Sequence, residues 1–278
     1  MEERLLEKIT ELVKNAYIEA CISLPEEVKK IFLDCLKTED SLIGKSVFEV
    51  LLENAEVARR ERIPLCQDTG VAVVWVKAGY QLDLSGVEDA INKGISLACK
   101  EGYLRASVCD PLTRKNTGDN TPAIVHYEFV KDPILEITVV PKGCGSENMS
   151  RLKMLSPSVG IEGIKEFVVE TVKQAGPNPC PPLVVGVGIG GNFETSALLS
   201  KKALFRLPGE PNPDPELNKL EEELKEEINA LGIGPLGFKG KTTCLAVHIE
   251  KAPCHIASLP VAVNLQCHCI RIKKVKVI

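Results

Sequence analysis

Residues 64–76, PLCQDTGVAVVWV, mark the point where the chain changes from helical to strand-like sequence. The Asp-Thr-Gly in this stretch is typical of a turn, and the β-branched and aromatic residues that follow favour a buried strand. A thiol, an amide and a carboxylate, Cys66-Gln67-Asp68, stand directly before that strand. The stretch therefore predicts a loop that presents chemically active side chains at the mouth of a sheet.

The sequence before this loop predicts helices. Residues 5–17, 25–39 and 44–61 carry apolar side chains at three-to-four spacing with charged residues between them. Such spacing places the apolar side chains on one face of a helix. We therefore interpret residues 1–62 as a helical N-terminal segment.

The sequence after the loop alternates between strands and helices. Runs rich in β-branched residues predict strands at 71–79, 123–130, 134–141, 182–190, 242–250 and 269–278. Amphipathic periodicity predicts helices at 86–103, 160–176 and 215–232. The fold class is therefore mixed α/β: residues 63–278 form a mixed sheet body flanked by helices, and the chain 1–278 is expected to be a single domain.

Composition excludes several classes of function. The net charge is −4 and aromatic residues make up 4% of the 278 residues. A nucleic-acid-binding protein usually has a basic surplus, and a base-stacking platform needs aromatics, so we expect no nucleic-acid partner. No apolar run reaches the roughly 20 residues that span a bilayer, and the N-terminus lacks the apolar core of a signal peptide. We expect a cytoplasmic protein without membrane contact.

The chain has eleven cysteines, an odd number that does not suggest a disulfide framework. No CxxC pair is present, so a zinc ribbon is not favoured, although a zinc-binding structural module stays an alternative. Four thiols in apolar surroundings are expected to be small buried hydrophobes: Cys21, Cys35, Cys99 and Cys244.

Three other thiols, Cys66, Cys180 and Cys267, lie in loop-like sequence where a thiolate could be presented. Iron–sulfur clusters take thiolate ligands from distant segments, and three thiolates on a four-iron cluster leave one iron open as a Lewis acid. From the residues alone the choice stays open, because four further thiols compete for the role: Cys109, Cys144, Cys254 and Cys269.

Two glycine-rich stretches look like nucleotide motifs. Residues 186–191, GVGIGG, match GxGxxG, but the surrounding sequence lacks the rest of a dinucleotide-binding unit. We expect these glycines to allow close approach of the backbone to a ligand or another segment. Residues 237–243, GFKGKTT, lack the first glycine of a P-loop, because Pro235 stands at its position.

Longer motifs carry a resemblance to a known family: PLCQDTG, NTGDNTP, KGCGSENMS, the Cys-Pro-Pro before GVGIGGNFE, and HIASLPVAVNLQC. Together they resemble the class I, iron–sulfur fumarate hydratases. More narrowly, they are similar to the separate α subunit of the two-subunit form, which the L-tartrate dehydratase α subunit also resembles. The resemblance implies a [4Fe–4S] cluster held by Cys66, Cys180 and Cys267, with Cys269 set aside.

The same resemblance implies roles for other side chains. Asp68 handles a proton or orients the iron-bound hydroxyl, and its alternative role is to cap the turn that follows it. His255 is the matching active-site histidine, whereas His126 and His248 lie in strand-like runs and are interpreted as structural histidines with satisfied hydrogen bonds. The residues implied in substrate binding are Gln67, Arg105, Cys144 and Gly145. We assign no role to the residues of the NTGDNTP loop.

The implied reaction is reversible hydration of fumarate to L-malate. Dehydration of L-tartrate to oxaloacetate is the nearest alternative, and a non-catalytic iron–sulfur protein is a further one. In this family most cationic substrate contacts, and a candidate base, come from the β part, which this chain lacks. We therefore expect a separate β subunit and a dimer of αβ pairs.

Overall fold

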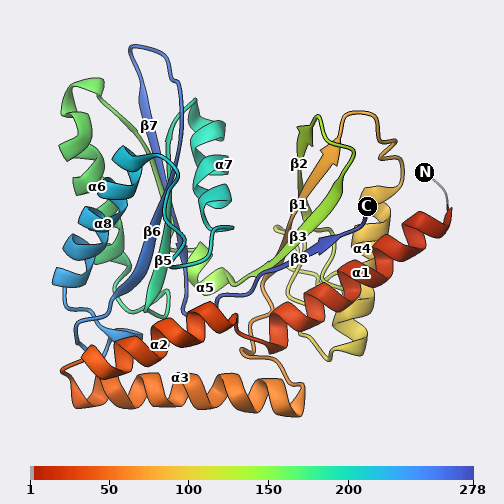
Figure 1. Ribbon diagram of the computed structural model, residues 1–278, viewed down its shortest axis with the longest axis horizontal. Helices are drawn as coiled ribbons and strands as arrows, with labels where there is room; N and C mark the ends of the chain where they lie inside the picture. Colours follow the sequence, from red (N-terminus) through yellow and green to blue (C-terminus); the bar gives the residue numbers. More distant parts are fainter. Residues whose placement is uncertain (1–2) are drawn as a thin grey trace. The chain divides into compact units, whose positions relative to one another are not determined.

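The computed structural model describes residues 3–278 and divides the chain into two compact units. Unit 1 comprises Met1–Pro25, Asn54–Cys144 and Arg271–Ile278, and unit 2 comprises Glu26–Glu53 and Gly145–Ile270. Two of the boundaries between the units fall within helices, α3 (Leu42–Glu61) and α5 (Cys144–Glu147), which Figure 1 labels.

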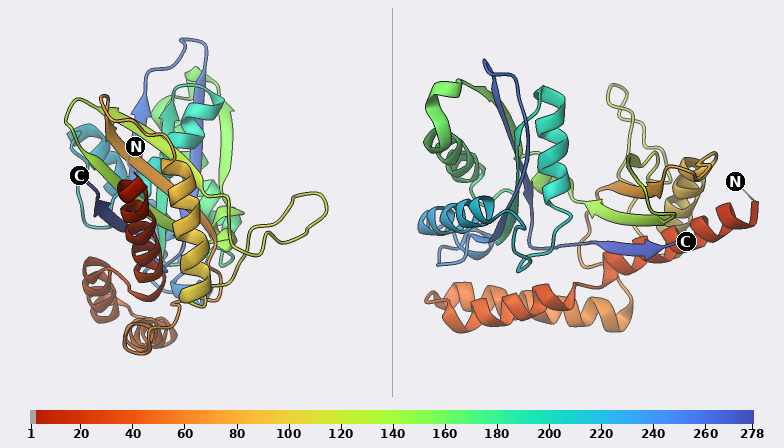
Figure 2. Two further views of the ribbon diagram at one scale, coloured as in Figure 1. Left: turned by 90° about the vertical axis from the view of Figure 1, so that its right-hand side faces the viewer. Right: turned by 45° about the horizontal axis from the view of Figure 1, so that its top comes forward.

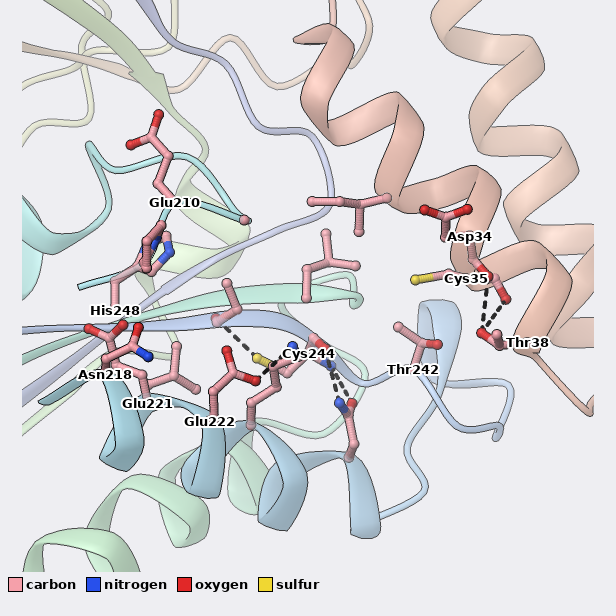
Figure 3. Close-up of a pocket in the computed structure, with 18 residues that line it drawn as sticks. Asp34, Cys35, Thr38, Glu210, Asn218, Glu221, Glu222, Thr242, Cys244 and His248 are labelled. Carbon is pink, nitrogen blue, oxygen red and sulfur yellow. Dashed lines mark hydrogen bonds and ion pairs between the residues drawn. The ribbon is translucent and has the colours of Figure 1, made fainter. Parts of the chain in front are cut away.

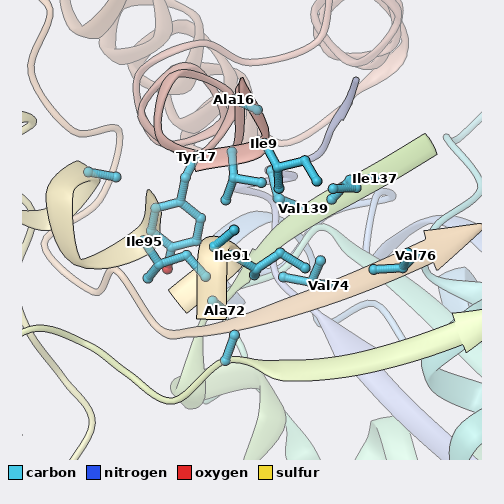
Figure 4. Packing of buried hydrophobic residues seen from close by; sticks show 14 of the residues in the cluster. Ile9, Ala16, Tyr17, Ala72, Val74, Val76, Ile91, Ile95, Ile137 and Val139 are labelled. Atoms are coloured by element: carbon cyan, nitrogen blue, oxygen red, sulfur yellow. The ribbon is translucent and has the colours of Figure 1, made fainter. Parts of the chain in front are cut away.

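Unit 1 is a four-stranded mixed sheet with the strand order β2-β1-β3-β8. Strands β1 and β2 are parallel, whereas β3 is antiparallel to both β1 and β8. Its elements are α1 (Glu3–Ile22), β1 (Val71–Gly79), α4 (Val87–Glu101), β2 (Ile124–Val130), β3 (Leu135–Lys142) and β8 (Lys273–Lys276). Helices α1 and α4 pack together over a core of aliphatic side chains from the sheet, with Tyr17 buried among them (Figure 4).

Unit 2 has a second four-stranded mixed sheet, with the order β4-β7-β5-β6. Strands β5 and β6 are parallel, and β7 is antiparallel to β4 and β5. Its sheet and flanking helices are β4 (Arg151–Leu155), α6 (Gly160–Ala175), β5 (Leu183–Gly190), α7 (Phe193–Ala203), α8 (Pro215–Ala230), β6 (Cys244–Ala252) and β7 (Leu259–Gln266). Unit 2 also contains helix α2 (Glu26–Thr38) and two 3-10 turns, Pro157–Val159 and Pro235–Gly237.

The two faces of the unit 2 sheet are covered differently. Helices α6 and α8 pack on one face through an aliphatic core, and α7 lies on the other (Figure 1). A Cβ at Gly186 would lie 2.3 Å from the Ser200 carbonyl oxygen, and one at Gly188 would lie 2.0 Å from that of Ser196. The glycines of the GVGIGG stretch therefore let β5 and α7 pack backbone against backbone, which confirms close approach of a second segment.

A buried carboxylate tethers the C-terminal end of α2. Glu39 is almost fully buried and accepts hydrogen bonds from the backbone N–H groups of Asp40 and Ser41 (3.0 and 3.1 Å). It also accepts from the N–H groups of Lys241 (3.0 Å) and Thr242 (3.2 Å), more than 200 residues away in the chain. One side chain thus fixes α2 to the segment that enters β6.

The mixed α/β fold class is confirmed. Six predicted strands and six predicted helices, including the three N-terminal ones, appear, most of them with bounds close to those expected. Strand β8 (Lys273–Lys276) is shorter than the predicted 269–278, and α1 (Glu3–Ile22) is longer than the predicted 5–17. The sequence reading missed strands β4 and β7 and helices α5 and α7. None of the described helices is both long and apolar enough to cross a membrane.

Candidate functional site

The Cys66-Gln67-Asp68 loop lies in unit 1, between α3 and β1. The N–H of Leu65 donates to the Cys21 carbonyl oxygen (2.8 Å), and the Asn54 side chain donates to the Leu65 carbonyl oxygen (3.0 Å). The Cys66 residue is half-buried and Gln67 is exposed. The main chain is thus anchored just before the loop, while its thiol and amide lie at the surface of the chain.

The Asp68 carboxylate bonds to two backbone groups. One oxygen accepts from the N–H of Gly70 (2.9 Å), which is the turn-capping role expected as the alternative for this residue. The other oxygen accepts from the N–H of Cys144 (2.8 Å) and so joins the loop to the start of α5. Gly70 has φ +75, and a Cβ there would lie 2.1 Å from the Lys142 carbonyl oxygen, so the turn requires glycine.

A buried arginine that sequence reasoning missed supports the same loop. Arg271 Nη1 donates to the carbonyl oxygen of Asp68 (2.6 Å). Burial raises the pKa of the Cys21 thiol to about 12, and Arg271, which also interacts with that thiol, acts in the opposite direction. Arg271 follows Cys267 by four residues, and its spacing from a predicted ligand was the signal that could have found it.

Asn120 is a second residue that sequence reasoning left without a role. Its side chain is fully buried, donates to the Gly70 carbonyl oxygen (3.1 Å), and accepts from the N–H groups of Ser107 (2.7 Å) and Val108 (3.2 Å). It anchors the long loop between α4 and β2 that extends from unit 1 (Figure 2). Arg105, an expected substrate contact with an exposed side chain, lies at the base of this loop.

The other two predicted ligands are brought together in unit 2. Cys180 precedes β5 and Cys267 follows β7, and the N–H of His268 donates to the Cys180 carbonyl oxygen (3.2 Å). Cys180 is exposed and Cys267 half-buried. Cys269, which the resemblance set aside, is buried.

The donor chemistry of these three thiols fits an iron–sulfur cluster. Thiolates are the preferred ligands of such clusters, and Cys66, Cys180 and Cys267 all lie on loops and are accessible in part. Of the four thiols expected to be buried, Cys21, Cys99 and Cys244 are buried, and burial raises their pKa values to about 12, 11 and 12. Burial also raises the pKa of Cys35, but this residue is only half-buried, so the expectation of full burial was wrong there. Among the described residues 3–278, the His, Cys, Asp and Glu side chains form no group of three that could hold a metal ion. Cys66 belongs to unit 1, and Cys180 and Cys267 belong to unit 2.

The expected substrate-binding residue Gly145 lies in a segment that is hydrogen-bonded to β7. Glu147, two residues further on, bonds to Lys201 on α7 (2.6 Å) and to the side chain of Asn264 on β7 (3.2 Å). The N–H of Leu265 adds a bond to the Ser150 hydroxyl (3.1 Å). Gly145 itself is exposed, and no atom lies within 4 Å of the position that a Cβ would take.

His255 lies at the exposed tip of the connection between β6 and β7. The N–H of Ala257 donates to its Nδ1 (3.1 Å). Because Nδ1 accepts this bond, the proton of the neutral ring is assigned to Nε2. His255 is therefore arranged to donate a hydrogen bond from Nε2, as a contact with a carboxylate or hydroxyl would require.

The two histidines interpreted as structural lie within strands. His126 on β2 packs against Trp75, with ring centroids 5.2 Å apart. Burial, and then the charge of Arg206, lower the pKa of His248 to about 3. His248 is therefore neutral, and its Nδ1 has no hydrogen-bond partner among the described residues, so the expectation of a fully satisfied side chain was wrong at this atom.

A pocket of about 600 Å³ opens beside β6, the edge strand of the unit 2 sheet (Figure 3). Its walls carry four carboxylates, those of Asp34, Glu210, Glu221 and Glu222, against one ammonium, that of Lys225, and none of the predicted site residues. Carboxylate walls repel a dicarboxylate, because like charges in proximity are unfavourable. We therefore do not place the substrate in this pocket.

Comparison with known proteins shows the family of the chain. Residues 10–276 match the family model described as fumarate hydratase (Fumerase). A Methanocaldococcus jannaschii protein, provisionally named L(+)-tartrate dehydratase subunit alpha, is 47% identical over 279 residues, covering 97% of this chain and 98% of that protein. The L(+)-tartrate dehydratase subunit alpha of Escherichia coli strain K12 is 34% identical over 271 residues, covering 96% and 89%.

The family match and these two relatives place the chain in a class, the iron–sulfur hydro-lyases. Within this class the chain belongs to the α-subunit family that the fumarate hydratase model describes, and its expected membership is confirmed. This class carries an iron–sulfur cluster, so the cofactor type follows from membership.

Proposed function

We propose that the chain is the α subunit of an L(+)-tartrate dehydratase, which eliminates water from L-tartrate to give oxaloacetate. The observation that carries this proposal is identity of 47% and 34%, over nearly the whole chain, with proteins named as α subunits of that enzyme. Hydration of fumarate, the reaction expected from the sequence, is the second candidate, because the matching family model is described as fumarate hydratase.

We propose Cys66, Cys180 and Cys267 as the cluster ligands. With three thiolate ligands, a bound [4Fe–4S] cluster supplies an open iron that acts as a Lewis acid toward the leaving hydroxyl. A substrate with two carboxylates needs both ends held, and the groups of this chain would bind one of them. Arg105 would hold one carboxylate through its planar guanidinium.

The remaining residues would orient the hydroxyl and move the proton. His255 would donate from Nε2 to the substrate, and the amide of Gln67 would donate to a carboxylate. Asp68 would orient the departing hydroxyl or take up a proton, from a position fixed by its bonds to Gly70 and Cys144. Gly145 would leave room for the substrate beside the backbone.

A separate β subunit is part of this proposal, since the two relatives are named as α subunits. The implied cationic contact of this chain is chiefly Arg105, aided by His255, and one guanidinium does not clamp two carboxylates. An obligate partner would bury roughly 2,000 Å² or more of surface. We propose a dimer of αβ pairs as the active assembly.

The test is an anaerobic assay of the reconstituted αβ protein on both acids. A site that bonds the second hydroxyl of tartrate rejects malate strongly, so we expect kcat/KM for L-tartrate to exceed that for L-malate by about a hundredfold or more. The opposite ratio would identify a fumarate hydratase. Turnover of neither acid, with the cluster present, would reject both enzymatic candidates.

The α chain by itself serves as the control. We expect it to assemble a cluster and to show almost no turnover, because half of the substrate contacts are missing. Full activity of the α chain without a partner would overturn the proposed dependence on a β subunit. The native mass of the reconstituted protein distinguishes an αβ pair from a dimer of such pairs.

A further inference from the structure

Three side chains in unit 2 form a closed ring of hydrogen bonds. Lys201 Nζ donates to the Glu147 carboxylate (2.6 Å) and to Asn264 Oδ1 (3.2 Å). Asn264 Nδ2 donates in turn to the same carboxylate (3.2 Å). Each member therefore contacts both others, and we call this set the Lys201 triad.

The Lys201 ammonium is largely buried, so its pairing with the Glu147 carboxylate matters for the stability of this region. The side chain of Lys201 is 16% exposed, that of Glu147 is 38% exposed, and Asn264 is buried. An ammonium ion in such surroundings requires a charged partner and satisfied hydrogen bonds. Removal of the ammonium would remove the Lys201–Glu147 ion pair and so weaken the attachment of the segment that carries Glu147.

The triad connects the two segments of unit 2 that carry expected site residues. Glu147 lies two residues after Gly145, an expected substrate contact, and Asn264 lies three residues before Cys267, an expected cluster ligand. Lys201 comes from a third element, α7, and contacts both. Glu147 and Asn264 are 117 residues apart in the chain, and the triad adds a side-chain contact to the β4–β7 pairing and the Ser150–Leu265 bond that join the same segments.

We propose that Lys201 is a positioning residue, which fixes the Gly145 segment against the strand end that bears Cys267 so that a bound substrate meets both. The proposal rests on the proposed function for its substrate, and on the triad alone for its structural part. Lys201 itself contacts neither reacting atoms nor the cluster in this role.

The experiment compares Lys201→Met with a matched variant, Lys165→Met. Lys165 joins α6 to α8 through Glu223 and Glu227, and its side chain is 15% exposed, close to that of Lys201. Amide hydrogen exchange of the α chain is measured for residues 144–150 and 264–267. Steady-state constants and iron content are then measured on the αβ protein loaded with its cluster.

We expect Lys201→Met to accelerate exchange in residues 144–150 about tenfold or more and to leave iron content unchanged. We expect its KM to rise about tenfold with kcat within about twofold, the pattern of lost substrate binding in ground and transition states alike. Lys165→Met should change neither the exchange in residues 144–150 nor KM. Unchanged exchange at 144–150, or faster exchange with unaltered KM, would overturn the proposal.

Glu147→Gln is a second variant for the case that Lys201→Met does not fold. It keeps the shape of the side chain while removing the charge, and we expect the same pattern at smaller amplitude. If the wild-type αβ protein turns over neither acid, the proposed function fails, whereas the exchange measurement still decides whether the triad anchors the Gly145 segment.

Discussion

Asp68 and Cys144, separated by 76 residues, are joined by a 2.8 Å hydrogen bond from a backbone N–H to a carboxylate oxygen. The Asp68 carboxylate also caps the turn at Gly70, and Arg271 donates a hydrogen bond to the main-chain carbonyl oxygen of Asp68. The loop that bears Cys66 is thus fixed at three points around one residue. A fixed loop can present its thiol and amide in a single orientation, as a cluster ligand and a substrate contact both require.

The first prediction concerns the cluster ligands. Replacement of Cys66, Cys180 or Cys267 by serine should remove most of the iron and acid-labile sulfide from anaerobically prepared protein, because a hydroxyl is a poor ligand for these clusters. Cys35→Ser is the control, and it should keep full iron content. Retention of a full cluster by Cys267→Ser, combined with its loss in Cys269→Ser, would show that the ligand near the end of β7 is Cys269 instead.

A second prediction separates chemistry from assembly at Asp68. Asp68→Asn keeps the size of the side chain and an oxygen for the Gly70 bond, but it loses the charge. We expect iron content near wild type and turnover lower by about a hundredfold, the usual scale for loss of a proton-handling group.

Asp110→Asn is the control for this variant, because the Asp110 carboxylate also caps a turn, at Leu112 and Thr113, in the same unit. It should leave turnover unchanged. Equal, small effects of both variants would assign Asp68 to turn formation alone.

The third prediction uses the open space at Gly145. Its φ is not in the left-handed region and no atom lies within 4 Å of the place where an added Cβ would stand, so Gly145→Ala should change the free energy of unfolding by no more than about 0.5 kcal/mol. The methyl group would occupy space proposed for the substrate, and KM should rise about tenfold. Asn148→Ala, exposed in the same segment, is the control for both measurements. An unaltered KM in Gly145→Ala would place the substrate elsewhere.

The fourth prediction is a pH dependence of stability at Glu39. Burial raises the pKa of this carboxyl, but bonds from the N–H groups of Lys241, Ser41, Thr242 and Asp40 lower it by more, so it lies below the ordinary 4.5. A carboxyl with a lowered folded pKa stabilises the protein above its unfolded pKa. This contribution is lost as pH falls through the lowered, folded-state pKa.

Urea denaturation tests this dependence. At pH 7 Glu39→Gln should reduce the free energy of unfolding by about 2–3 kcal/mol, since buried N–H donors lose a charged acceptor. The difference from wild type should shrink in the acid range below pH 4.5. Glu49→Gln, exposed on α3, should have little effect at either pH. A difference independent of pH would show that the charge of Glu39 contributes nothing.

The sequence predicted those elements whose pattern is local. Residues 71–79 have the β-branched run of a buried strand, and β1 has these bounds. Strand β7 was missed because its buried positions include Asn264 and Gln266, polar side chains that sequence reading places at the surface. Their partners, Glu147 for one and the Cys269 carbonyl oxygen for the other, become visible only in three dimensions.

The candidate site likewise has residues that local motifs predicted and residues that only the three-dimensional structure identifies. The family motifs pointed to Cys66, Cys180 and Cys267, and the structure links the last two loops through His268. It also identifies supports that no motif indicated, such as Asn120, whose four bonds all reach segments that come earlier in the chain. Hydrogen bonds between distant segments leave no periodic trace in a sequence, and this is why such residues were not found.

The glycines of β5 set how closely α7 packs on the sheet, and so they determine the position of the Lys201 ammonium on α7. A Cβ at Gly188 would lie 2.0 Å from the Ser196 carbonyl oxygen and 2.5 Å from the Ser200 nitrogen, whereas ordinary contacts begin near 3.4 Å. One added methyl group would therefore lift α7 away from the sheet at the residue directly before Lys201. A change in a strand interior, with no polar atom involved, would thus alter the reach of an ammonium group toward its carboxylate.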